Sequence, residues 1–203
     1  MRTRPRVRLV WRSCIRSTKS LLLKSVLALT AHSYLRATLE VIGDAGNVLA
    51  FPPLWAGALQ ADFFTGYDVI YLDLHGFTDS IYLYFDREGQ QGALNVNTLK
   101  DAKLGDVVVF STACNFTKTA FPQAFYDAGA QAVIGGEGLN YAGKTRIAGA
   151  QQLAKFLIKR LNAGEMPDRA LANAKMNLRF TPAALLRRPE VIDALDFEIL
   201  RRQ

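Results

Sequence analysis

Two short apolar runs, each followed at once by a reactive side chain, constrain the fold of this 203-residue chain most strongly. One run covers residues 67–74 and leads into His75 and Gly76, and the other covers residues 106–113 and leads into Cys114. Both are short and rich in β-branched and aromatic residues, which is typical of strands buried inside a parallel sheet. Open α/β sheets bind their ligands beyond the carboxyl ends of the strands. We therefore expect the imidazole and the thiol to share a crevice.

Further strand-like and helical segments alternate along the chain. We predict strands at residues 25–32, 80–86 and 131–134, short helices beginning at residues 34 and 54, and helices at 121–129, 144–161, 167–178 and 189–200. Residues 20–42 also fit a single apolar helix, because their leucines fall on several faces, although we favour a strand followed by a helix. This order predicts an α/β layered domain with a mostly parallel sheet.

Positive charge is concentrated at the N-terminus of the chain. The net charge is +7, and eight of the 25 lysines and arginines lie in the first 24 residues, where no acidic residue occurs. Such an arm can bind nucleic acid or an anionic surface, but it lacks the interleaved aromatic residues of a nucleic-acid-binding segment. We predict a flexible basic lead-in over residues 1–20, with at most weak nucleic-acid binding, and one domain over residues 21–203.

The composition argues against several other classes of protein. No apolar run reaches the roughly eighteen residues that span a bilayer, and Lys24 interrupts the candidate signal segment 21–31. The two cysteines, Cys14 and Cys114, are not placed to form a structural disulfide. With only two histidines, they offer no paired zinc-ligand spacing. We therefore expect no metal, no cofactor and a reducing, cytoplasmic location.

Cys114 and His75 together suit nucleophilic catalysis. A free thiol has a pKa of roughly 8.5 and must lose its proton before it attacks a carbonyl, and a histidine can accept that proton. The tetrahedral oxyanion needs two hydrogen-bond donors. The backbone N–H groups of Gly76 and Cys114 can supply them. Considered alone, Cys114 could simply be a small buried apolar residue, and His75 could simply be a hydrogen-bonded loop residue. The prediction of catalysis therefore depends on the two residues together.

These two segments, residues 71–76 and 108–115, resemble the caspase-like (clan CD) cysteine peptidases, and most of all CHAT-domain and gingipain-type peptidases. Residues 120–136, 156–164 and 170–178 resemble the helix, turn, strand and closing helices that follow the nucleophile in those families. The resemblance covers about residues 67–180. It implies a caspase-like three-layer sandwich and a cysteine endopeptidase that works through a Cys114–His75 dyad and an acyl-enzyme. Its partners would be a protein or peptide substrate and a regulatory protein.

The resemblance also implies a pocket for P1, the substrate residue on the N-terminal side of the cleaved bond. The candidates on this chain are Asp79, Thr112, Glu137 and Asn140. Some relatives that cleave after Lys or Arg have an acidic residue two positions before the cysteine, where this chain has Thr112. A basic P1 preference therefore requires Glu137 or Asp79 to replace that charge.

Three polar residues near these positions carry a structural and a functional interpretation. Asp73 shares its strand face with His75, so it either orients the imidazole or serves the structure, and we favour the structural role. His32 follows the first predicted strand, where a loop histidine is the simpler interpretation. Asn115 either hydrogen-bonds the turn after the nucleophile or caps the segment that follows it.

Two alternatives to an active peptidase remain open at this point. Residues 138–145 formally complete the phosphate-loop pattern G-x-x-x-x-G-K-T between a predicted strand and a predicted helix. A nucleotide-binding protein would follow from that pattern. A caspase-like domain that has lost catalysis and binds a partner is the other alternative.

Overall fold

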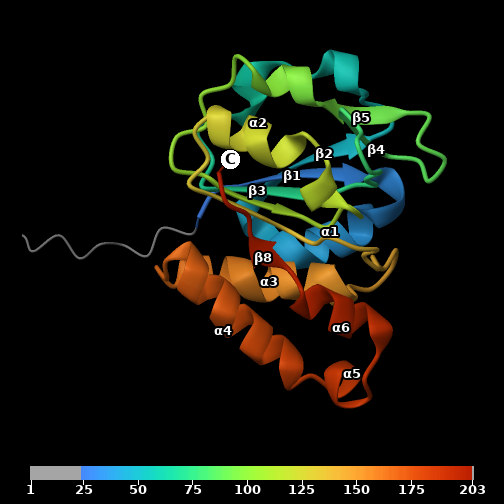
Figure 1. Ribbon diagram of the computed structural model, residues 1–203, viewed down its shortest axis with the longest axis vertical. Coiled ribbons are helices and arrows are strands. Elements are labelled where there is room, and N and C mark those ends of the chain that lie inside the picture. Colours follow the sequence, from blue (N-terminus) through green and yellow to red (C-terminus); the bar gives the residue numbers. More distant parts are fainter. Residues whose placement is uncertain (1–23, 203) are drawn as a thin grey trace, which may run out of the picture.

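The computed structural model describes residues 24–202, and the predicted basic lead-in lies outside this range. A six-stranded sheet has the order β2-β1-β3-β6-β7-β8, and β4 and β5 form a separate two-stranded sheet (Figure 1). The pairs from β2 to β7 are parallel, whereas β8 runs antiparallel to β7. The strands are β1 (Val26–Ala31), β2 (Gly46–Phe51), β3 (Val69–Asp73), β4 (Tyr82–Tyr84), β5 (Gly92–Asn95), β6 (Val108–Ser111), β7 (Ala132–Gly135) and β8 (Glu198–Ile199).

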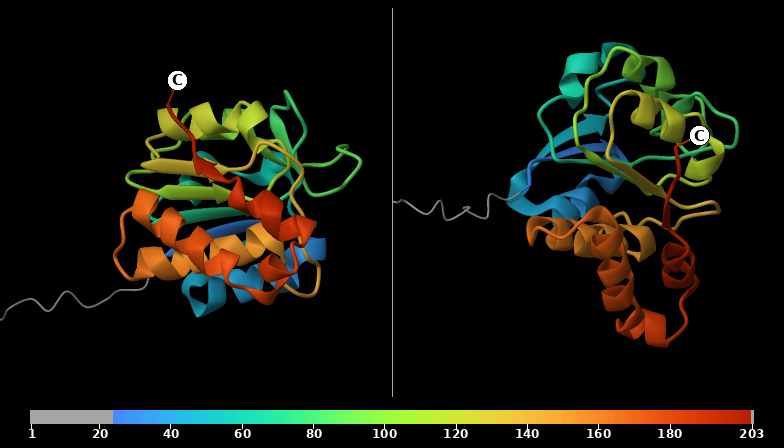
Figure 2. Two further views of the ribbon diagram at one scale, coloured as in Figure 1. Left: turned by 60° about the horizontal axis from the view of Figure 1, so that its bottom comes forward. Right: turned by 60° about the vertical axis from the view of Figure 1, so that its left-hand side comes forward.

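Helices cover both faces of the main sheet. The α-helices are α1 (Leu35–Ile42), α2 (Phe121–Asp127), α3 (Gly149–Asn162), α4 (Pro167–Arg179), α5 (Pro182–Leu185) and α6 (Pro189–Leu195). Helix α2 and the β4–β5 hairpin lie on one side, and α1 and α3 lie on the other, with α4 and α6 packed against α3 (Figure 1). Figure 2 shows the C-terminal helices gathered on that same side. None of the helices within residues 24–202 is both long and apolar enough to cross a bilayer.

The central strands are buried on both faces, which confirms the α/β fold class with a mostly parallel sheet flanked by helices. In β1, Leu27 and Leu29 enter the apolar core on the α2 side, whereas Val26 and Ala28 enter the core beneath α1 and α3. Strand β3 alternates in the same way. A strand with two buried faces shows a continuous apolar run rather than an alternating one, which is why β1, β3 and β6 were recognisable in the sequence.

The structure differs from the predicted elements at several places, and β5 and α5 correspond to no predicted element. Residues 46–51, expected as turn and loop, form the edge strand β2, and residues 54–64 form two 3₁₀ segments, Ala56–Ala58 and Ala61–Phe64, instead of a short helix. Helix α3 begins at Gly149 rather than at residue 144, and the predicted C-terminal helix ends at Leu195, before β8. These segments depend on tertiary pairing, which local periodicity does not report.

A row of buried polar side chains crosses the sheet just below the edge at which β3 and β6 end. The Asp73 carboxylate is fully buried and accepts hydrogen bonds from Thr38 Oγ1 (2.9 Å), Thr112 Oγ1 (2.7 Å) and Gln151 Nε2 (2.8 Å). Burial raises the pKa of Asp73, and the same three donors oppose that rise. A buried carboxylate requires such donors. The structural role is therefore the one that Asp73 shows, because His75 is not among its partners.

Gln151 connects this carboxylate to the loop before α3. Its Oε1 accepts the N–H groups of Gly143 (2.8 Å) and Ala148 (3.2 Å), while its Nε2 donates to Asp73 and to the Gly143 carbonyl (3.1 Å). One fully buried side chain thus fixes both the loop and the polar row.

We expect Gln151→Leu to lower the free energy of unfolding by roughly 2–4 kcal/mol, because buried amide groups would lose their partners. Urea unfolding measures this change. The control is Gln152→Leu, at a half-buried neighbour whose side chain forms no hydrogen bond within residues 24–202, and we expect this variant to stay within about 0.5 kcal/mol of the parent protein. Equal losses in the two variants would contradict a special role for Gln151.

Candidate active site

The register of two central strands brings the predicted pair to one edge of the sheet. Strands β3 and β6 pair in parallel from Val69 with Val108 to Leu72 with Ser111. His75 and Cys114 each lie three residues beyond that last pair. They therefore leave neighbouring strands at the same level of the carboxyl edge, where open α/β sheets bind ligands.

His75 is held on two sides. Its backbone exchanges hydrogen bonds with Tyr84, N–H to carbonyl at 2.8 Å and carbonyl to N–H at 2.9 Å, so the imidazole is tied to the β4–β5 hairpin. Its Nε2 lies 3.2 Å from the Tyr34 hydroxyl. Burial lowers the pKa of His75, the Arg87 guanidinium lowers it further, and the carboxylates of Asp86 and Glu88 oppose these effects. The imidazole is therefore mainly neutral near pH 7 and can accept a proton.

Cys114 is a half-buried free thiol at the start of a tight turn. The backbone N–H of Asn140 donates to its Sγ at 3.2 Å, and Asn140 Nδ2 donates to the Ala113 carbonyl at 3.0 Å. The next residue, Asn115, has a left-handed backbone (φ 51°) and donates its N–H to the Gly138 carbonyl at 2.9 Å. Asparagine tolerates this conformation well. The turn that contains Asn115 and the loop after β7 therefore fix the position of the thiol jointly.

The thiol and the imidazole have separate partners in this structure. Within residues 24–202, Sγ of Cys114 contacts Asn140 and the ring of His75 contacts Tyr34, with no direct hydrogen bond between sulfur and imidazole. The two groups share one edge of the sheet but do not touch. Catalytic hydrogen bonds are often long in ligand-free enzymes and tighten when the substrate binds.

Gly76 lies directly against the nucleophile turn. A Cβ atom at this position would stand 2.2 Å from the carbonyl oxygen of Cys114 and 3.1 Å from Cβ of Ala113. Only glycine permits this approach. Among the described residues, the backbone N–H groups of Gly76 and Cys114 donate to no acceptor. Two unpaired backbone donors on adjoining segments are the components of an oxyanion hole.

The four residues predicted to form a P1 pocket have different surroundings. Asp79 and Glu137 are exposed, and both meet Lys118: Asp79 donates its N–H to the Lys118 carbonyl (3.1 Å), and the Lys118 ammonium lies 3.4 Å from Glu137. Asn140 contacts Cys114 itself. Thr112, in contrast, is buried, and its hydroxyl donates to Asp73 and to the Leu72 carbonyl, so it faces the polar row.

An acidic hollow of about 500 Å³ is linked to the thiol through Asn140, which lines the hollow and donates its N–H to Sγ of Cys114. One wall is the segment 136–141, which contains Glu137 and Asn140, and the other wall comes from α6 and β8. Four carboxylates line it: Glu137, Asp193, Asp196 and Glu198. The sequence interpretation missed the last three and also Tyr34. The position of Tyr34, three residues beyond the end of β1, is the one signal that could have pointed to it.

The phosphate-loop alternative does not match the structure of its segment. A phosphate loop needs free backbone N–H groups at the start of a helix. Here α3 begins at Gly149, after the motif, and the Gly143 N–H is donated to Gln151. His32 is exposed, and its ring forms no hydrogen bond within the described residues. No group of three or more metal-binding side chains gathers anywhere in the part of the chain that the structure describes.

Comparisons with known proteins identify a fold. No protein-family model matches the sequence, and no curated protein matches it. Among solved structures, the chain is similar to the Arg-specific cysteine proteinase gingipain R, with a TM-score of 0.55 and 14% sequence identity over 86% of this chain. The chain spans 45% of that structure. At this level of identity the likeness establishes the caspase-like fold and no more.

We expect Gly76→Ala to lower the free energy of unfolding by about 1–3 kcal/mol, because the new methyl group collides with the Cys114 carbonyl. Urea unfolding gives the value. Gly138→Ala is the matched control, since a Cβ at Gly138 meets no atom within 4 Å. A Gly76→Ala variant as stable as the control would show that the two segments are not in contact.

We expect Arg87→Gln to raise the pKa of His75, because it removes a positive charge that disfavours the imidazolium. Titration of the histidine ring signals by NMR measures the change, and His32 is the internal reference in the same spectrum. Glu88→Gln removes a charge of opposite sign and should lower the pKa of His75. Shifts of the same sign in both variants would rule out this electrostatic account.

Proposed function

We propose that this chain is a cysteine endopeptidase in which Cys114 is the nucleophile and His75 is the proton carrier. The observation that carries the proposal is the shared level of these two residues at the carboxyl edge of β3 and β6. The largely neutral imidazole and the half-exposed free thiol support it. The caspase-like fold, which gingipain R also has, adds a cysteine proteinase as a precedent.

The proposed reaction has two stages. His75 accepts the thiol proton, the sulfur bonds to the peptide carbonyl carbon, and the N–H groups of Gly76 and Cys114 hold the resulting oxyanion. When this intermediate collapses, the C–N bond breaks and the leaving amine takes the proton from His75. A thioester remains on Cys114. Water then attacks the thioester, gives a proton to His75 and releases the carboxylate product as the thiol is restored.

The acidic hollow supports a substrate with Lys or Arg at P1. Its wall contains Asn140, whose N–H meets the attacking sulfur, so a P1 side chain would enter beside the scissile bond. Four carboxylates surround that space, and one lysine, Lys118, pairs with one of them. In this proposal Glu137 and the three acidic residues of the C-terminal segment replace the charge that Thr112 does not provide. Asp79 lies near Lys118, at the margin of the site.

We expect Cys114→Ala to reduce peptide cleavage by more than about a thousandfold, because Cys114 is the one thiol within residues 24–202. Cleavage is measured with peptides that carry Arg at P1, alongside mass-spectrometric labelling by a peptidyl-Arg chloromethyl ketone. Cys14→Ala is the control and should cleave and label normally.

Cleavage that persists in Cys114→Ala, or a parent protein whose Cys114 resists the electrophile, would overturn the proposal. The second result would favour the inactive interaction domain. Replacing the P1 Arg of the peptide by Glu should abolish cleavage, since the hollow would repel that side chain. Equal cleavage of both peptides would remove the acidic hollow from the proposal without affecting the dyad.

A further inference from the structure

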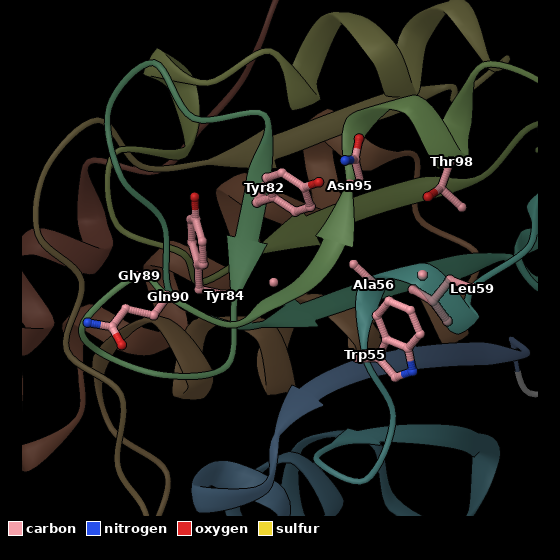
Figure 3. Close-up of a pocket in the computed structure, with 11 residues that line it drawn as sticks. Trp55, Ala56, Leu59, Tyr82, Tyr84, Gly89, Gln90, Asn95 and Thr98 are labelled. Atoms are coloured by element: carbon pink, nitrogen blue, oxygen red, sulfur yellow. The ribbon is translucent and has the colours of Figure 1, made fainter.

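A second hollow has a volume of about 560 Å³. Its walls come from the segment after β2 and from the β4–β5 hairpin with the residues that follow it (Figure 3). The residues that line it include three aromatic residues, two amides and a threonine: Trp55, Tyr82, Tyr84, Gln90, Asn95 and Thr98. No charged side chain occurs among the described residues that line it. Its volume is in the range of ligand pockets.

Glycines set the positions of two of these rings. A Cβ at Gly57 would stand 2.2 Å from the Trp55 ring, and a Cβ at Gly92 would stand 2.6 Å from the Tyr82 ring. Each ring therefore lies against a glycine of the same wall, in space that a larger residue would occupy. Trp55 remains 61% exposed even so. A large aromatic face held in place yet open to solvent is arranged for a ligand, because burying that face is favourable and costs little side-chain entropy.

One residue, Tyr84, connects the lining of the aromatic hollow to His75 of the proposed active site. Tyr84 lines the hollow with its side chain, while its backbone forms both hydrogen bonds to the backbone of His75. The order of the strands places the acidic hollow beyond Cys114, next to β7 and β8, and the aromatic hollow beyond His75, toward β2. The two hollows therefore flank the dyad.

The proposed chemistry assigns a direction to the substrate across this dyad. The leaving amine must take its proton from His75, so the residues on the C-terminal side of the scissile bond leave past the imidazole. We propose that the aromatic hollow binds an uncharged apolar or aromatic side chain of the substrate, one to three residues C-terminal to the cleaved bond. This inference rests on the proposed function. The uncharged lining excludes a matching site for Asp, Glu, Lys or Arg side chains.

The test compares peptides that share Arg at P1 and carry Phe, Leu, Ser or Glu at the second position after the cleaved bond. We expect kcat/KM to be about tenfold higher for Phe and Leu than for Ser and Glu. Trp55→Ala should remove this preference. So should Gly57→Ala, which displaces the indole without deleting it. Phe180→Ala, which deletes an exposed aromatic ring on the C-terminal helices, is the control and should keep the preference.

A substrate that lacks these residues separates the hollow from the dyad. A peptidyl-Arg methyl ester has no peptide beyond the cleaved bond, so the parent protein and Trp55→Ala should hydrolyse it equally. Peptide cleavage with no preference at this position, or an equal loss of ester and peptide hydrolysis in Trp55→Ala, would overturn the inference.

Direct binding tests the hollow without any turnover. In a Trp11→Phe, Cys114→Ala background, Trp55 is the remaining tryptophan, and its fluorescence should change on addition of a peptide that begins with the residues after the cleaved bond. Stronger binding of the Phe peptide than of the Ser peptide supports the hollow even if no cleavage is found, in which case the proposed function fails alone. Equal or undetectable binding of both contradicts the hollow.

Discussion

One buried carboxyl group organises the half of this domain that contains His75 and Cys114. Asp73 is completely enclosed, and an ionised carboxylate is tolerated in such a place only when donors surround it. Its donors come from α1, from the end of β6 and from α3, so a single group aligns three elements that are distant in the sequence. His75 follows Asp73 by two residues, and Cys114 follows its partner Thr112 by two residues. The positions of both reactive groups thus depend on a network that lies one layer below them.

Above this network, close contacts between backbone segments, rather than side-chain packing, hold His75 and Cys114 in place. Gly76 touches the carbonyl of Cys114, Asn115 adopts a left-handed conformation, and the loop after β7 supplies an N–H to the sulfur. Strained or tightly approached backbone of this kind concentrates where a structure must hold reactive groups in place. The side chains around the dyad are then free to differ in character. Carboxylates lie on the cysteine side and uncharged aromatic rings on the histidine side.

The sequence was sufficient for the central strands and for the placement of His75 and Cys114 at one edge of the sheet, because buried parallel strands are continuous apolar runs whose carboxyl ends share an edge. It was insufficient where long-range contacts decide the structure. Strand β2 is half-exposed and adjoins a turn, and β8 exists through its pairing with β7 alone. The start of α3 depends on the hydrogen bonds of Gln151. The acidic hollow joins Glu137 to Asp196 and Glu198, which no local pattern could have brought together.

The short strand β8 has a consequence for how this protein meets copies of itself. The outer edge of a terminal strand exposes unpaired N–H and carbonyl groups, which are a template for a strand of another molecule. Here β8 occupies the edge of β7 at Ile134 and Gly135, and the Leu200 N–H pairs with the Val133 carbonyl at 2.8 Å. Tyr126 adds a hydrogen bond from its hydroxyl to the Leu200 carbonyl. Aggregation through the edge of β7 would therefore require β8 and Leu200 to detach from β7 first.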